Sequence, residues 1–228
     1  MSIKRNFSLG NYNSFGVKHK ANFFIEIKNK GQINDIINNK KYDKVRKLIL
    51  GGGSNILFTK DYNGIVFLNK IKGIRKISED DNNVLLRVGS GENWDDFVEY
   101  CVKKNYYGLE NLSLIPGSVG AAPIQNIGAY GVEVKNLIEN VEGIFLDNGI
   151  KKKFNNKSCE FQYRDSIFKG KLKNKFFITS VDFVLSKIKS FNISYRDLKH
   201  LDIKNISLNS LRNEIIKIRN SKPKIMKK

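Results

Sequence analysis

The most informative stretch of this 228-residue chain is LIPGSVGAAPIQNIGAYG, at residues 114–131. Its eighteen residues include four Gly, three Ala and two Pro, and none is charged, although 28% of the whole chain is charged. Small uncharged residues allow a large flat ligand or a polyphosphate to lie directly against the main chain. We therefore expect a cofactor site here. A tight Gly/Ala crossover with a purely structural role would show the same composition.

A second segment, LGGGSN at residues 50–55, ends a short apolar run that we expect to be a buried strand. Consecutive glycines let backbone N–H groups approach an anion closely, and Ser54 and Asn55 could add side-chain donors. The segment matches neither a Walker loop, which needs Gly-Lys-Ser/Thr, nor a dinucleotide fingerprint opening a helix, because residues 56–58 look extended. A plain glycine turn between strands explains it equally well.

A third segment, FQYRDSIF at residues 161–168, places Arg164 among aromatic residues. A guanidinium held stiffly in this way could bind an anion or stabilise a developing enolate. The alternative is a surface ion pair between Arg164 and Asp165.

The composition excludes several classes of protein. Two Cys cannot build a disulfide scaffold or a zinc or iron–sulfur cluster, and two distant His argue against a metal site, so we expect none. No apolar run is long enough to span a membrane, and from the residues at the N-terminus we expect no secretion signal. We expect a cytoplasmic protein with no membrane partner.

The charge is strongly positive, with 41 Lys and Arg against 22 Asp and Glu, which gives +19. Such a balance is typical of proteins that bind nucleic acid or another polyanion. However, 33 of the 41 basic residues are Lys and they are scattered along the chain, as A/T-rich codon usage would leave them. We therefore expect no nucleic-acid partner.

The hydrophobic pattern predicts a mixed α/β chain. Apolar alternation or short apolar runs predict strands at residues 21–28, 47–50, 65–68, 84–88, 141–146, 150–154 and 176–185. Helical spacing predicts helices at residues 31–40 and 92–104 and another that begins at Ser207. The second of these helices would bury Cys101 in the core. Asp147-Asn148-Gly149 between two strands is typical of a hairpin, because Asn and Gly can both adopt positive φ.

Taken in order, these motifs resemble one family, the UDP-N-acetylenolpyruvoylglucosamine reductases, also called UDP-N-acetylmuramate dehydrogenases or MurB. The resemblance covers residues 5–222. Besides the three segments above, it rests on Asn13-Ser14-Phe15-Gly16, Gly89-Ser90-Gly91-Glu92-Asn93-Trp94 and Gly108-Leu109-Glu110-Asn111-Leu112.

The resemblance implies a two-lobed FAD-binding domain of the vanillyl-alcohol-oxidase or PCMH type, followed by a substrate lobe. Residues 1–72 would form the first lobe, residues 73–190 the second, and residues 191–228 the start of the substrate lobe. The implied activity is the NADPH-dependent, FAD-mediated reduction of UDP-N-acetylglucosamine enolpyruvate, a UDP-sugar, to UDP-N-acetylmuramate in peptidoglycan precursor synthesis.

The resemblance also assigns roles to residues. Those that would bind FAD are Gly51, Gly52, Gly53, Ser54, Asn55, Ile115, Pro116, Gly117, Ser118, Gly120, Ala121, Ala122, Gln125, Asn126, Gly128 and Ala129. Arg164 falls on the arginine that polarises the substrate carboxylate and would be catalytic. Tyr195 and Lys222 fall on residues that bind the nucleotide-sugar diphosphate.

Family members continue into a further C-terminal segment, which contains the serine that protonates the enolate and the glutamate that partners the arginine. We therefore expect this chain to be C-terminally truncated, with its substrate lobe largely missing. Ser166 does not replace the proton donor, because it belongs to the Tyr-Arg-Asp-Ser motif. The loss would impair the reaction, require a separately encoded C-terminal fragment, or leave a flavin-binding remnant without turnover. A polyanion-binding protein that keeps only the fold has no need for the uncharged segment.

Overall fold

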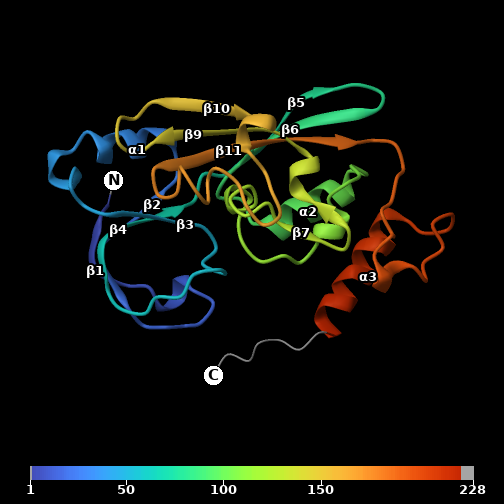
Figure 1. Ribbon diagram of the computed structural model, residues 1–228, viewed down its shortest axis with the longest axis horizontal. Coiled ribbons are helices and arrows are strands. Elements are labelled where there is room, and N and C mark those ends of the chain that lie inside the picture. Colours follow the sequence, from blue (N-terminus) through green and yellow to red (C-terminus); the bar gives the residue numbers. More distant parts are fainter. Residues whose placement is uncertain (1, 222–228) are drawn as a thin grey trace.

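The computed structural model describes residues 2–221 and places most of them in two lobes, each built on one main β-sheet (Figure 1). The first lobe contains a four-stranded sheet with the strand order β1-β2-β4-β3. Its strands are β1 (Lys4–Ser8), β2 (Lys20–Ile27), β3 (Lys47–Leu50) and β4 (Tyr62–Asn69). Strands β2 and β3 run parallel to β4, whereas β1 pairs antiparallel with β2.

Helix α1 (Lys30–Ile37) connects β2 to β3 and begins with a capping box. The Asn29 side chain accepts a hydrogen bond from Gln32 N at 3.1 Å, and the Gln32 side chain accepts one from Asn29 N at 3.3 Å. The helix ends at Ile37, before the predicted end at residue 40. Asn39 explains this difference, because its side chain accepts from Lys41 N and caps the next turn instead.

The second lobe contains a five-stranded antiparallel sheet with the strand order β10-β9-β11-β6-β5. Its strands are β5 (Ile74–Glu79), β6 (Asn83–Gly89), β9 (Ile138–Phe145), β10 (Lys151–Asn155) and β11 (Phe176–Ser186). A separate two-stranded ribbon consists of β7 (Gly128–Ala129) and β8 (Val132–Glu133). The long strand β11 lies at the centre of the large sheet, which confirms the extended apolar run predicted there.

Helix α2 (Trp94–Lys103) packs against the large sheet. Trp94, Phe97 and Cys101 are buried on one helix face, as the helical spacing predicts, and the Trp94 ring lies 6.1 Å from that of Phe183 on β11. Burial raises the pKa of the Cys101 thiol well above its ordinary value, so this residue is an inert core thiol.

The turn at Asp147-Asn148-Gly149 joins β9 to β10 as predicted, but its backbone differs from the expectation. Only Gly149 adopts a positive φ, of +73°, so Asn148 does not use the positive φ that the motif allows. The Asn148 side chain instead accepts from Ile150 N at 2.9 Å, and Gly149 N donates to Phe145 O at 2.9 Å. The connection is therefore a longer loop that closes on a glycine.

The two lobes share part of their core. One buried cluster combines Phe67 of the first lobe with Ile144 and Phe177 of the second, and the two Phe ring centroids lie 6.4 Å apart. Asn69, buried at the end of β4, donates to Ser90 Oγ at 2.7 Å. These contacts fix how the lobes face each other.

Helix α3 (Leu208–Ser221) follows the second lobe and packs on it through residues near the end of the uncharged segment. Ser207 Oγ accepts from Ser210 N at 3.1 Å, which confirms the predicted start of the helix. Leu211 and Ile215 are buried together with Tyr130. Lys222 lies outside the described residues.

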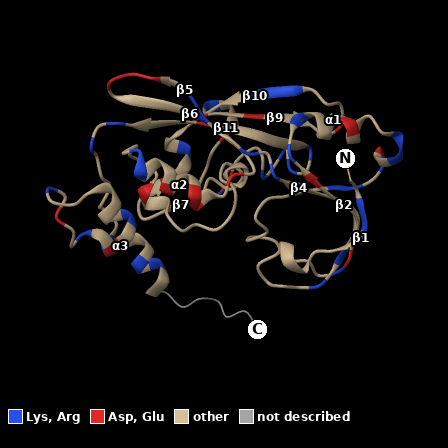
Figure 2. Ribbon diagram, turned by 180° about the vertical axis from the view of Figure 1, so that it is seen from behind, with Lys and Arg blue, Asp and Glu red and all other residues tan. Residues whose placement is uncertain are grey.

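Basic residues are spread over both lobes, with three consecutive lysines on β10 (Figure 2). Some of this charge is paired: Arg87 donates to both Asp182 oxygens, at 2.7 and 2.9 Å, across β6 and β11. Within residues 2–221, no helix combines the length and the apolar character that a membrane crossing needs.

Candidate functional site

A cavity of about 490 Å³ lies between the two lobes. Its walls are the glycine turn after β3, the uncharged segment, and residues that lead into β11. Most of the predicted FAD-binding residues line it: Gly51, Gly53, Ser54, Asn55, Ile115, Pro116, Gly117, Ser118, Gly120, Ala121, Ala122 and Gln125. The fold therefore brings together two segments that are far apart in the sequence.

The glycine turn approaches the uncharged segment so closely that side chains would not fit. A Cβ atom on Gly52 would lie 3.0 Å from the Cα of Gly117. Gly53 has a φ of +68°, and a Cβ there would lie only 2.1 Å from the carbonyl oxygen of Tyr12. Both positions therefore require glycine, Gly52 because it faces Gly117 and Gly53 because of its positive φ and its contact with Tyr12. The turn thus borders the cavity with main chain that carries no side chains.

Two hydrogen bonds bridge the lobes at the edge of the cavity. Ser54 Oγ donates to Pro116 O at 3.2 Å, and Asn55 Nδ2 donates to Gln125 Oε1 at 2.9 Å. All four residues were predicted to contact the cofactor. Their positions on facing walls mean that a single ligand could replace both bonds.

The groups that line the cavity fit a ligand with a flat ring system and phosphates, such as FAD. The Ser118 hydroxyl is buried and has no hydrogen-bond partner within residues 2–221. Lys169 and Lys173 line the same cavity, and their positive charge can balance that of phosphates. Lys169 Nζ also donates to Arg164 O at 2.8 Å. Sequence reasoning missed these two lysines, because nothing distinguishes them among the 33 lysines of the chain.

Asn126 does not line the cavity, although its neighbours Gln125 and Ile127 do, and its side chain is fully buried. Its Nδ2 donates to Gln162 O at 2.9 Å and to Glu133 Oε2 at 3.1 Å. Nearby, Ser166 Oγ donates to Ile124 O at 2.7 Å. These bonds attach the Tyr-Arg-Asp-Ser motif to the uncharged segment. Contact between Asn126 and a cofactor stays a prediction.

A second hollow, of about 330 Å³, lies at the end of the uncharged segment. It brings together the two described residues that were predicted to act on substrate, Arg164 and Tyr195, with two predicted to bind FAD, Gly128 and Ala129. Tyr130 and Arg219 complete its lining. Four separate parts of the chain therefore meet at this hollow.

Arg164 is held by its backbone and by two hydrogen bonds, one of which runs from Lys169 Nζ to the Arg164 carbonyl oxygen at 2.8 Å. Its φ is +54°, and its Nη2 donates to Gly128 O at 2.6 Å. Asp165 does not pair with it; the Asp165 carboxylate instead accepts from Ser166 N at 2.9 Å. Across residues 2–221 no carboxylate lies within 4 Å of the Arg164 guanidinium, so its charge remains available to an anionic ligand.

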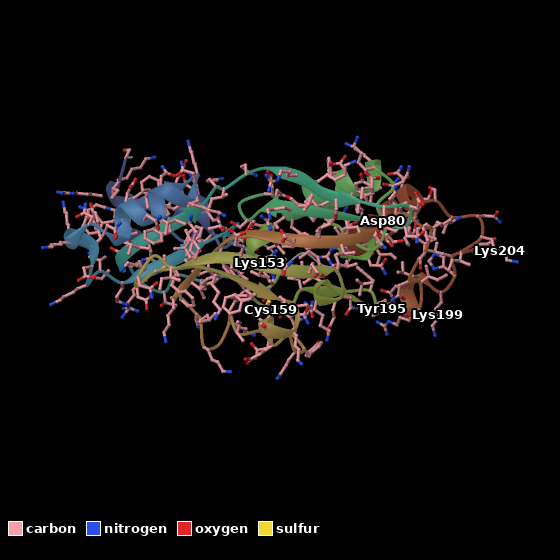
Figure 3. All side chains as sticks on the ribbon, turned by 90° about the horizontal axis from the view of Figure 1, so that it is seen from above. Asp80, Lys153, Cys159, Tyr195, Lys199 and Lys204 are labelled. Carbon is pink, nitrogen blue, oxygen red and sulfur yellow. The ribbon has the colours of Figure 1, made fainter. Side chains whose placement is uncertain are left out.

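Tyr195 lies on the segment that leads from the second lobe to α3 (Figure 3). Its ring packs edge-on against that of Tyr130, with centroids 5.3 Å apart. Buried Asn111 links the two segments that carry these rings, since its Nδ2 donates to Tyr130 O and to Asn192 O, each at 2.8 Å. These contacts hold the half-exposed phenol of Tyr195 in the lining of the hollow.

Arg219, in the last turn of α3, is the residue of this hollow that sequence reasoning missed. Like Arg164, it has no carboxylate within 4 Å in the described part of the chain. Two unpaired guanidinium groups in one hollow favour a ligand with negative charge.

Comparisons with known proteins agree with this geometry. The FAD binding domain model matches residues 21–149, more than half of the chain. The UDP-N-acetylenolpyruvoylglucosamine reductase of Amoebophilus asiaticus is 42% identical over 226 residues, which are 97% of this chain and 67% of that protein. The enzyme of the same name from Flavobacterium johnsoniae is 45% identical with the same coverage. The chain thus spans about two thirds of the length of these relatives.

Solved structures show the same fold. The reductase (MurB) from Thermus caldophilus superposes with a TM-score of 0.72 at 21% identity, over 98% of this chain and 71% of that one. A p-cresol methylhydroxylase matches 77% of this chain, and 38% of its own, with a TM-score of 0.51 at 17% identity. Both confirm the two-lobed, PCMH-type FAD-binding fold. The chain belongs to the UDP-N-acetylenolpyruvoylglucosamine reductase family, whose members are FAD-dependent oxidoreductases.

Proposed function

We propose that the chain catalyses the NADPH-dependent, FAD-mediated reduction of UDP-N-acetylglucosamine enolpyruvate to UDP-N-acetylmuramate, a cytoplasmic step of peptidoglycan precursor synthesis. The observation that carries this proposal is an uncharged, glycine-bordered cavity together with a hollow whose two arginines have no carboxylate within 4 Å among residues 2–221. Bound FAD would supply the two-electron chemistry between NADPH and the enolpyruvyl group.

The cavity residues would bind and orient FAD. The backbone of residues 51–55 and the ammonium groups of Lys169 and Lys173 would contact its diphosphate. The small residues of segment 115–122 would lie against the ring system, and the free Ser118 hydroxyl would gain a hydrogen-bond partner. The same walls would exclude water from the reacting face.

The hollow would bind the substrate. Arg164 would contact the enolpyruvyl carboxylate, where negative charge grows as the enolate forms, and a fixed cation there is worth several kcal/mol, on the order of 3. Tyr195 and Arg219 would contact the diphosphate of the UDP-sugar. A role for Lys222 at that diphosphate belongs to the same proposal.

Flavin absorbance of the purified chain tests this function. We expect a yellow protein that NADPH bleaches at about 450 nm and that the enolpyruvyl substrate reoxidises without oxygen. A protein that NADPH bleaches but substrate does not reoxidise would be the alternative, a flavin-binding chain without turnover. In that case, recovery of reoxidation with a second polypeptide would support a separately encoded fragment. A chain that remains colourless after refolding with FAD contradicts the proposal.

A further inference from the structure

Main-chain hydrogen bonds hold the uncharged segment against the start of α2. Val119 N donates to Glu92 O at 2.9 Å, and Trp94 N donates to Gly117 O at 3.1 Å. This run of bonds stops at Gly117, since Pro116 has no N–H group. Of the residues before Gly117, Pro116 accepts from Ser54 Oγ on the other lobe, but Leu114, at the start of the segment, needs an anchor within its own lobe.

Asp95, in the first turn of α2, provides that anchor. Its Oδ1 accepts from Leu114 N at 2.5 Å and from Arg212 Nη1 at 2.8 Å, and its Oδ2 accepts from Arg212 Nη2 at 2.9 Å. Burial alone would raise the pKa of Asp95, but the hydrogen bonds from Arg212 and from Leu114 N outweigh it, and the pKa lies below its usual value. The carboxylate is therefore ionised and joins α2, α3 and the uncharged segment.

Leu114 needs such an anchor because of its backbone. Its φ is +58°, in the left-handed region that residues other than glycine rarely adopt. Without the hydrogen bond to Asp95, this residue would gain by relaxing to negative φ. The change would redirect Ile115 and Pro116, which form a wall of the cavity.

We propose that Asp95 and Arg212 are positioning residues that hold Leu114 in its left-handed conformation and so couple the docking of α3 to the shape of the FAD cavity. Arg212 belongs to a helix outside the cavity wall and is almost completely buried, with only 6% of its surface exposed. Nothing in the sequence motifs points to either residue. The inference rests on the proposed placement of FAD in this cavity.

The test compares two arginine variants that remove similar ion pairs. Arg212→Leu removes the bidentate pair with Asp95, whereas Arg87→Leu removes the bidentate pair with Asp182 in the large sheet. Neither Arg87 nor Asp182 lines the cavity. Both variants should lower the melting temperature. We expect only Arg212→Leu to weaken FAD binding, by about tenfold in Kd, measured by flavin fluorescence.

A rescue experiment separates a positioning role from a general effect on folding. Glycine adopts positive φ without strain, so Leu114→Gly added to Arg212→Leu should restore much of the FAD affinity without restoring the melting temperature. Arg212→Lys keeps the charge but loses the bidentate geometry, so its FAD affinity should lie between that of Arg212→Leu and that of the original chain.

Hydrogen–deuterium exchange gives a readout that does not need FAD. Exchange at residues 114–118 should become faster in Arg212→Leu than in Arg87→Leu. The inference would be overturned if residues 114–118 exchanged equally fast in the two variants. It would also be overturned if Leu114→Gly did not restore the FAD affinity that Arg212→Leu loses. Failure of the original chain to bind FAD would instead count against the proposed function. The exchange comparison would still test whether Asp95 and Arg212 position Leu114.

Discussion

Arg164 is the side chain with the clearest expected effect on the reaction. Arg164→Lys keeps a positive charge but loses the planar donor that bonds Gly128 O and faces the hollow. We expect reoxidation by substrate to slow on the order of 100-fold, while reduction by NADPH changes little. Stopped-flow absorbance would separate the two half-reactions. Arg196→Lys is a matched control, because the Arg196 side chain is 84% exposed; equal slowing of both half-reactions would point to a folding role for Arg164.

Arg219 allows a similar test of the substrate diphosphate. Arg219→Gln should weaken the binding of UDP by about tenfold, because a charge-assisted contact to phosphate is lost. Lys217→Gln, two residues earlier on α3 and largely exposed, removes the same charge from the same helix and should have little effect. Calorimetric titration with UDP measures both variants. Similar losses in both would mean that the effect is one of net charge.

Helix α2 depends on its first turn, where Asn93 accepts hydrogen bonds from Asp95 N at 2.8 Å and from Asp96 N at 3.1 Å. Asn93→Ala should lower the free energy of unfolding by about 1 kcal/mol, measured with urea. Ser207→Ala removes the corresponding cap of α3. Since the uncharged segment is bonded to the start of α2, FAD affinity should fall more in Asn93→Ala than in Ser207→Ala. The reverse order would contradict this link.

The elements that the sequence predicts well are those with strong apolar patterns, such as β11 and α2. Strands β1 and β5 were not predicted, because they are edge strands with mainly exposed polar residues. The cavity could be anticipated from two glycine-rich segments. The positions of Lys169 and Lys173 in the cavity, and of Arg219 in the hollow, could not be predicted. They depend on tertiary contacts between distant segments, which no local motif encodes.

The molecule as a whole should lose stability in acid. Burial alone would raise the pKa of Asp182, but hydrogen bonding and charge from Arg87 and Lys153 lower it below its ordinary value of 3.8. A carboxyl with a lowered folded pKa stabilises the protein above its unfolded pKa, and this stability is lost as the pH falls through the folded pKa. Melting temperatures measured from about pH 5 to about pH 2 should therefore fall less steeply in Asp182→Asn. An unchanged slope would contradict this account.

The shared cluster around Phe67 and Phe177 has a thermodynamic consequence. Because each sheet buries part of its interior against the other, heating should produce one cooperative transition whose calorimetric and van't Hoff enthalpies agree. Added FAD should move that single peak to a higher temperature, and two separate peaks would contradict the idea.

The lobe boundary near residue 72 stays a prediction about architecture. A polypeptide cut there should yield two fragments that aggregate when separate and fold only when mixed.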